Sequence, residues 1–189
     1  MAIILASASP RRRELLAQIG CEFKVVTSDI IEDNEQNIDP NQLAMAHAAA
    51  KAKAVAVLVN RDDVVIGADT IVVLDGKVYG KPVDVDDAKR MLLSLSGREH
   101  QVITGLAVAH RGLLFTDCAV TIVKMANLTA EDIDNYVASG EPMDKAGAYA
   151  IQGKGAVFID GIEGCYSNVV GLPLRRLAKI LAKVGVSVS

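Results

Sequence analysis

The chain has 189 residues, of which 51% are hydrophobic, so an intrinsically disordered protein is excluded and one sizeable core with room for two lobes is expected. Its net charge of -3 gives no general attraction to nucleic acid or to an anionic membrane, and any phosphate-binding site must therefore be local. We accordingly expect neither a nucleic-acid polymer nor a membrane among its partners.

The three cysteines are widely separated and form no CxxC pair, which indicates reduced thiols in a cytoplasmic protein rather than a disulfide framework or a zinc site. No charge-free apolar run reaches the roughly 18 residues that a membrane span needs. The short apolar N-terminus is followed by arginines where a secretory signal would have its cleavage region. No linker, repeat or low-complexity segment appears, so we expect residues 1–189 to form a single domain.

The first segment is predicted to be a strand, a tight loop and a helix. The apolar run Ala2–Ala6 predicts the strand. Ser9 is the expected N-cap, Pro10 takes the first helical position, and Gly20 ends the helix. Arg11–Arg13 are unusual there, because cations in a first turn oppose the helix dipole. A bound phosphate would resolve the conflict, and a solvated basic patch is the alternative.

The next segments are a short strand, an acidic loop and a long helix. Weak alternation predicts the strand over Glu22–Val26, and Glu32 in the acidic stretch Ser28–Asp39 is a candidate ligand for a divalent ion. An alanine-rich pattern predicts a helix over Gln42–Val59. We expect His47 on this helix to be a surface or partly buried residue rather than a metal ligand, since a lysine occupies the position four residues later.

The stretch Val64–Pro82 places an acid inside an apolar run. Burying the carboxylate of Asp69 is costly unless a cation, a metal or several hydrogen-bond donors pair with it. In one interpretation Gly67–Thr70 is a bulge or kink, and Asp69 bonds nearby backbone N–H groups. In the other, Asp69 lies at a cleft mouth as a general base or metal ligand, and a hairpin turn at Asp75–Gly76 brings Lys81 back near it.

The remaining pattern alternates helices with paired strands and ends in a basic amphipathic helix. Asp84 is expected to cap a helix that runs to about Leu95, and a hairpin is predicted from strands Gln101–His110 and Leu113–Met125 with a turn at Arg111–Gly112. A capping box at Thr129 predicts a helix to about Ser139, which is followed by a site-lining loop over Glu141–Gly155. The last predicted elements are a strand over Ala156–Ile162, a loop over Gly164–Leu172, and a helix over Pro173–Val184 with Arg175, Arg176, Lys179 and Lys183 on its polar side.

Several short motifs are distributed over nearly the whole chain. They are Leu5–Arg13, Gly67–Thr70 with Gly80–Pro82, Leu95–Gly97 with His100, Glu141–Tyr149 with Ile151–Gly153, and Tyr166–Leu174. Together, and in this order, they resemble the Maf family of nucleoside triphosphate pyrophosphatases. The resemblance implies an α/β fold of the Maf and ITPase kind, in which an elongated mixed sheet is flanked by helices and two lobes enclose a central cleft, and it implies a homodimer.

The same resemblance implies an activity. Family members hydrolyse a nucleoside triphosphate to the monophosphate and pyrophosphate with a divalent metal cation, Mg²⁺ or Mn²⁺. The sequences of Asp144–Tyr149 and Ile151–Gly153 are similar to those of the family branch that acts on dTTP and UTP, rather than to those of the branch that acts on 7-methyl-GTP.

By this match, Asp69 is the catalytic acceptor and a metal ligand together with Glu32, and other polar residues surround the triphosphate. Lys51 and Lys81 are counted with the catalytic set. The substrate-binding set is Ser7, Arg11, Arg12, Thr70 and Gln152, of which Arg11, Thr70 and Gln152 are implied to set base preference.

These residue types suit the chemistry. Cleavage between the α and β phosphorus atoms needs an in-line water and neutralisation of the developing negative charge. Asp69 would take a proton from that water or hold the metal that acidifies it, while the arginines and lysines bind the triphosphate. Gln152 carries a donor and an acceptor on one amide, which match the N3–H and carbonyl groups of uracil and thymine.

Two other functions stay open at this level. The chain could be a nucleotide-binding regulator of cell division or septum formation without relevant turnover, or a house-cleaning pyrophosphatase for non-standard purine triphosphates. We expect His100 and His110 to have structural roles.

Overall fold

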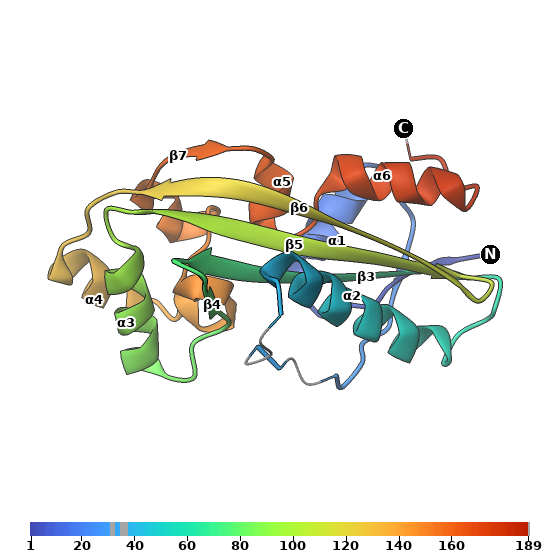
Figure 1. Cartoon of the computed structure of the whole chain (residues 1–189), viewed down its shortest axis with the longest axis horizontal. Coiled ribbons are helices and arrows are strands. Elements are labelled where there is room, and N and C mark those ends of the chain that lie inside the picture. Colours follow the sequence, from blue (N-terminus) through green and yellow to red (C-terminus); the bar gives the residue numbers. More distant parts are fainter. Residues whose placement is uncertain (31–32, 35–37, 189) are drawn as a thin grey trace.

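The computed structural model describes residues 1–30, 33–34 and 38–188, which form a mixed sheet flanked by helices (Figure 1). The predicted fold class is confirmed. The strands are β1 (Ile3–Leu5), β2 (Lys24–Val25), β3 (Val64–Leu74), β4 (Lys77–Tyr79), β5 (Glu99–His110), β6 (Leu113–Met125) and β7 (Ile159–Glu163). The helices are α1 (Pro10–Gln18), α2 (Pro40–Ala56), α3 (Val85–Leu95), α4 (Ala130–Ala138), α5 (Tyr166–Val170) and α6 (Leu174–Lys183), with 3-10 turns η1 (Glu141–Asp144), η2 (Ala146–Ala148) and η3 (Gly153–Phe158).

Three long strands, β3, β5 and β6, run side by side along the molecule and are antiparallel (Figure 1). At one end β1 lies parallel between β2 and the start of β3. At the other end β4 pairs with the end of β3, and β7 pairs with the end of β6. The long strands therefore belong to two lobes at once.

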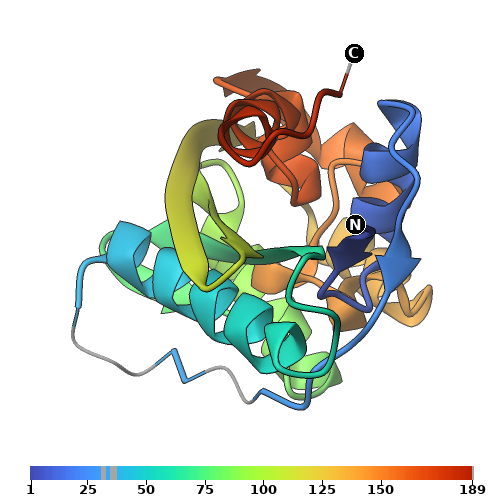
Figure 2. The ribbon, with the colours of Figure 1, turned by 90° about the vertical axis from the view of Figure 1, so that its right-hand side faces the viewer.

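The helices separate by face and by lobe. Figure 2 shows α2 on one face of the sheet, with α1, α5 and α6 on the opposite face. The second lobe has its own core, in which α3 and α4 pack on the far ends of the long strands. None of the helices in the described part of the chain has the length and apolar character needed to cross a bilayer.

Capping and turn residues in the sequence correctly predicted where most helices and strands begin and end. Asp84 caps α3 by accepting a hydrogen bond from the N–H of Asp87, and Thr129 forms the predicted capping box with Asp132. The β3–β4 turn has positive φ at both Asp75 and Gly76, as a two-residue hairpin turn requires. The three cysteines are free, as predicted.

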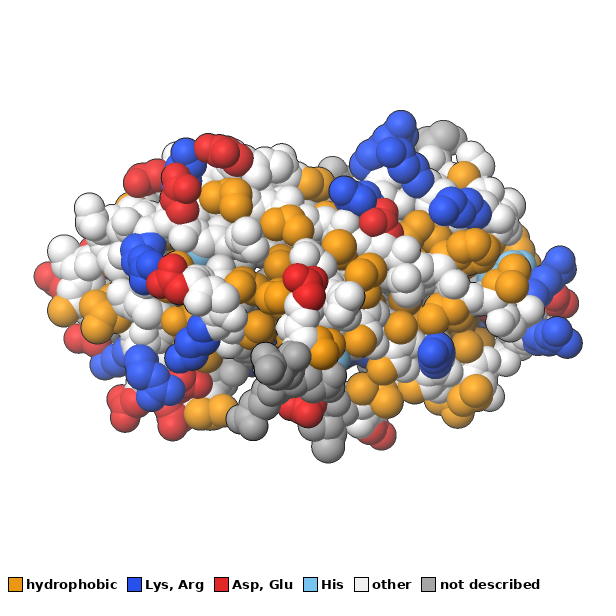
Figure 3. Space-filling view, viewed as in Figure 1, with side chains coloured by type: hydrophobic (Ala, Val, Ile, Leu, Met, Phe, Trp, Pro, Cys, Tyr) orange, Lys and Arg blue, Asp and Glu red, His pale blue; other side chains and the backbone are white. Residues whose placement is uncertain are grey.

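The predicted basic face of α6 is confirmed as well. Leu177, Ile180 and Leu181 are buried on its inner side. Lys and Arg side chains gather over α6 on the surface at the upper right of Figure 3. The exposed members are Arg175, Arg176, Lys179 and Lys183.

Two predictions near the C-terminus are wrong. The expected strand over residues 156–162 begins only at Ile159, which pairs with Met125, and η3 precedes it. The expected loop over residues 164–172 contains α5. Buried Asn168 in α5 donates through its side-chain amide to the carbonyl of Val102 and to the hydroxyl of Thr121, at 3.0 and 2.9 Å. These long-range contacts, rather than local propensity, hold the short helix.

Helix α2 lies unusually close to the sheet. A Cβ atom at Gly105 would overlap the backbone carbonyl of Ala44, and one at Gly67 would overlap that of Ala48. The helix presents small, fully buried side chains at these points, among them Ala44 and Ala48. Glycine on the strands and alanine on the helix together allow backbone to meet backbone.

We predict that Gly105→Ala lowers the free energy of unfolding by about 2 kcal/mol, because the added methyl group must displace the backbone of α2. Urea denaturation monitored by circular dichroism would measure the loss. The matched control is Gly161→Ala on β7, where an added Cβ meets nothing within 4 Å. Equal stability of the two variants would contradict the close approach.

His100 on β5 lies in the core of the second lobe. Its Nε2 is 2.7 Å from the hydroxyl oxygen of Tyr149, and the two rings meet edge to face with centroids 5.3 Å apart. Burial lowers the pKa of His100 to about 4, because the charged ring would lose its hydration. These contacts agree with the structural role expected from the sequence.

This histidine predicts a pH dependence of stability. The folded-state pKa lies below the unfolded value of about 6.5, so the unfolded chain takes up a proton first, and stability falls as the pH drops from about 6.5 toward 4. The contribution amounts to about 1.4 kcal/mol per pH unit inside that window. His100→Gln, which cannot titrate, should flatten this part of the profile in urea unfolding at a series of pH values. A variant with the wild-type slope would refute the assignment.

Candidate functional site

A cavity of about 420 Å³ opens where the edge of β3 lacks a neighbouring strand in the described structure. The partner β1 ends its pairing at Ile66, and β4 begins its pairing at Val72. The residues between them therefore face a gap between the two lobes. The volume falls within the range of ligand cavities, about 300–1,000 Å³.

Asp69 lies in this gap and is only 3% exposed. Its Oδ1 accepts a hydrogen bond from Nζ of Lys51 at 2.6 Å, and its Oδ2 lies 3.2 Å from Nδ1 of His47. Burial would raise the pKa of Asp69, but the hydrogen bond with His47 and the positive charges of Lys51 and Arg12 outweigh it and hold the pKa below its ordinary value. The carboxylate is therefore ionised at neutral pH.

The bulge interpretation of this stretch is wrong. Pairing between β3 and β5 continues without a register shift from Val65 to Val73, with Asp69 opposite Gly105. Strand alternation directs Asp69 toward α2 and Thr70 toward the opposite face of the sheet. His47 and Lys51, four residues apart, lie on the face of α2 that meets Asp69.

Arg12 is buried on the other side of the same cavity. Its Nε donates to the carbonyl of Gly171 at 2.8 Å, one terminal nitrogen donates to the hydroxyl of Ser7 at 3.1 Å, and the other donates to the hydroxyl of Thr70 at 3.0 Å. These contacts come from the first loop, from β3 and from the end of α5. They fix the guanidinium plane, so the orientation of this cation is set by the fold.

The hydroxyl groups behind Arg12 form a directed chain. Thr104 donates to the carbonyl of Asn168 at 3.0 Å, so it must accept from the hydroxyl of Thr70, which is 2.9 Å away. Thr70 in turn accepts from Arg12. Each hydroxyl has one proton, and this direction satisfies all of the contacts together.

Residues at the mouth of the cavity come from two loops and from the first turn of α1. Lys81 is exposed and reaches the cavity lining through the β3–β4 hairpin, as predicted. Arg11 is half-buried and donates to Oδ2 of Asp144 at 3.2 Å. Gln152 is half-buried in the lining. The structure thus brings into one cavity Ser7, Arg11, Arg12, Lys51, Asp69, Thr70, Lys81 and Gln152.

The predicted metal ligand Glu32 lies outside the described residues. Among the described residues, no group of three His, Cys, Asp or Glu side chains could hold a metal ion. The carboxylate of Asp69 nevertheless fits Mg²⁺ or Mn²⁺, because these ions prefer oxygen ligands and are usually bound by one or two carboxylates plus substrate phosphates. Each carboxylate oxygen can also accept more than one contact, so the bonds to His47 and Lys51 do not exhaust the group.

Three residues of the site, His47, Thr104 and Asn168, were not predicted from the sequence. The expectation that His47 is a surface or partly buried residue is wrong, since it is 5% exposed and contacts Asp69. Its Nε2 faces the carbonyl oxygen of Asp33 at 3.2 Å. The spacing of four residues between His47 and Lys51, which puts both on one helix face, was the signal available. Thr104 and Asn168 gave no signal, because only tertiary pairing places them behind Arg12.

Comparisons with known proteins identify the family. A family model of Maf-like proteins matches residues 2–184. A dTTP/UTP pyrophosphatase of Desulforamulus reducens is 52% identical over 188 residues, which are 98% of each chain. Its counterpart in Acetivibrio thermocellus is 53% identical over 194 residues, covering 98% of this chain and 96% of the relative, and that of Moorella thermoacetica is 52% identical over 188 residues, covering 98% and 96%. The chain therefore belongs to the Maf family.

Proposed function

We propose that this protein hydrolyses dTTP and UTP to the monophosphate and pyrophosphate. The observation that carries the proposal is the ionised carboxylate of Asp69 in one cavity with the fixed cations Lys51 and Arg12. The names of the similar proteins support the substrate, since each is a dTTP/UTP pyrophosphatase. A protein that only binds nucleotides has no need of a carboxylate beside cations that bind phosphate.

The cations on either side of Asp69 suit a triphosphate. Arg12 is held on one face of the sheet and Lys51 on the other, while Lys81 extends from the hairpin at the mouth. Fixed positive charges in a partly buried site stabilise the negative charge that spreads over the phosphoryl oxygens as the bond breaks. Asp69 would act on the attacking water, either by accepting its proton or by holding the metal that acidifies it.

A divalent cation would be held by Asp69, with Glu32 as the second carboxylate that the family resemblance implies. When bound, it would neutralise phosphate charge and lower the pKa of a coordinated water. The low pKa of Asp69 keeps the carboxylate charged, which suits this second role. We further propose that residues 1–189 act as one domain, in a cytoplasmic homodimer; the location rests on the free cysteines and the dimer on the family resemblance.

Base preference would depend on Arg11, Thr70 and Gln152. The amide of Gln152 can donate to a carbonyl of uracil or thymine and accept from N3–H at the same time. Thr70 is held by Arg12 and Thr104, so it contributes a fixed group beside the phosphate site.

We predict that Asp69→Asn lowers kcat for dTTP and UTP by a hundredfold or more, on the order expected for loss of a general base, while nucleotide binding survives. Pyrophosphate release with Mg²⁺ or Mn²⁺ would measure turnover over a panel of pyrimidine and purine triphosphates. Calorimetry would measure binding.

The control for this variant is Asp160→Asn, which changes an exposed aspartate outside the cavity lining. Near-normal pyrophosphate release by Asp69→Asn would reject the assigned role. A wild-type protein that binds nucleotides without turnover would instead support a regulator, and preference for non-standard purine triphosphates would support a house-cleaning enzyme.

Gln152→Glu should lower kcat/KM for dTTP and UTP relative to CTP by about tenfold, because a carboxylate cannot donate to a base carbonyl and repels it. Steady-state kinetics with each nucleotide would test this. An unchanged substrate ranking would argue against the amide as the base-recognition group.

A further inference from the structure

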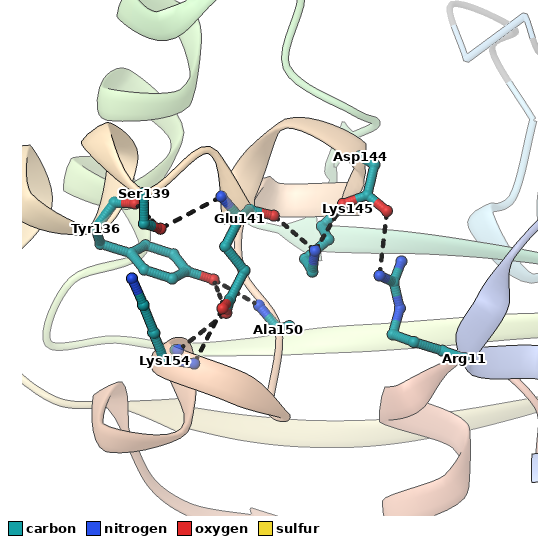
Figure 4. A network of polar contacts seen from close by, with 9 residues as sticks. Arg11, Tyr136, Ser139, Glu141, Asp144, Lys145, Ala150 and Lys154 are labelled. Atoms are coloured by element: carbon teal, nitrogen blue, oxygen red, sulfur yellow. Dashed lines mark hydrogen bonds and ion pairs between the residues drawn. The ribbon is translucent and has the colours of Figure 1, made fainter. Parts of the chain in front are cut away.

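The loop that carries Gln152 is fastened to the second lobe at both of its ends (Figure 4). On the near side, the backbone N–H of Ala150 donates to the hydroxyl oxygen of Tyr136 at 3.2 Å. On the far side, the N–H groups of Lys154 and Gly155 donate to the carboxylate of Glu141 at 3.1 and 3.2 Å. The segment between these attachments is Ile151–Gly153.

The two fastening side chains also hold each other. The hydroxyl of Tyr136 donates to Oε1 of Glu141 at 3.0 Å, so one charged group accepts from a side chain and from two backbone N–H groups. Hydrogen bonds to an ionised carboxylate are stronger than those between neutral groups. We call Tyr136 and Glu141 the loop clamp.

Both residues of the loop clamp are held in place by their surroundings. Tyr136 is 3% exposed on α4, and its ring packs edge to face against Phe158 with centroids 5.0 Å apart. Glu141 begins η1 and lies directly against the loop, since a Cβ at Gly153 would come within 2.7 Å of its Oε2. A side chain at Gly153 would therefore displace the carboxylate that holds the loop.

The 3-10 turn η1, which begins with Glu141, also contacts the side of the cavity where Arg11 lies. Nζ of Lys145 donates to the backbone carbonyl of Glu141 and to Oδ1 of Asp144, both at 2.6 Å, and Asp144 accepts from Arg11 (Figure 4). The loop that carries Gln152 is therefore connected through η1 to Arg11 of the first helix.

We propose that Tyr136 and Glu141 are positioning residues that set the base preference of the site by fixing the backbone on both sides of Gln152. The inference rests on the proposed function, because it requires that Gln152 contacts the base. The physical reason is that an amide must present its donor and its acceptor at once, and a small displacement of the backbone spoils both contacts.

The experiment compares Tyr136→Phe and Glu141→Gln with the wild type on UTP and CTP. These ribonucleotides share the same sugar and ring size and differ only along the hydrogen-bonding edge of the base, so their kcat/KM ratio isolates base recognition from cavity size. Each variant should lower the UTP-to-CTP ratio by about tenfold, as expected for the loss of one or two hydrogen bonds. Inorganic tripolyphosphate, which has no base, should inhibit wild type and variants with the same Ki.

Matched controls make the same chemical changes elsewhere. Tyr166→Phe alters an exposed tyrosine and Glu131→Gln an exposed glutamate on α4, both outside the cavity lining, and both should keep the wild-type ratio. In a background of Gln152→Ala, Tyr136→Phe should cause no further loss of discrimination, because residues that act through one another are not additive.

The outcomes separate the inference from the function. Variants that keep the wild-type ratio overturn the inference alone, and so does a Ki for tripolyphosphate that rises in parallel, because that result indicates a general structural role. Additive losses in the Gln152→Ala background also overturn it. A wild-type protein that turns over neither dTTP nor UTP overturns the proposed function together with the inference. If Glu141→Gln fails to fold, Tyr136→Phe gives the same comparison.

Discussion

The close contact between α2 and the sheet is the constraint on which the site depends. Glycine at positions 67 and 105 lets the backbone of the helix rest on β3 and β5. Only at this distance can the short carboxylate of Asp69 reach both Lys51 and His47. The ion pair offsets the cost of burying the charge, and it keeps an anionic group in the cavity beside the cations of Lys51 and Arg12.

Most helices and turns were predictable because their signals are local, whereas the arrangement of the sheet was expected from the family resemblance. Capping residues such as Asp84 and Thr129, and turn glycines such as Gly76, act within a few positions of the chain. The errors fall where tertiary contacts override local preference. Residues 166–170 form a helix because Asn168 bonds to β5 and β6, and no pattern within the segment contains that information.

Some residues of the site could be predicted from the sequence, and others could not. Asp69 could be found from sequence because an acid inside an apolar run needs a partner, although the identity of that partner could not be deduced. Lys51 and His47 share one helix face, but the sequence does not reveal which strand that face meets. The hydroxyl chain from Thr70 to Asn168 and the anchoring of the Gln152 loop by Glu141 depend on residues far apart in the chain, so only the folded structure brings them to light.

The three longest strands cross from one lobe to the other beneath the cavity. Moving the lobes apart would bend three strands that are paired along their length, so a hinge motion between the lobes is unfavourable in this molecule. Entry of a nucleotide and exit of pyrophosphate must instead rely on rearrangement of the rim, where the contact between Arg11 and Asp144 is exposed and easily exchanged for solvent or phosphate.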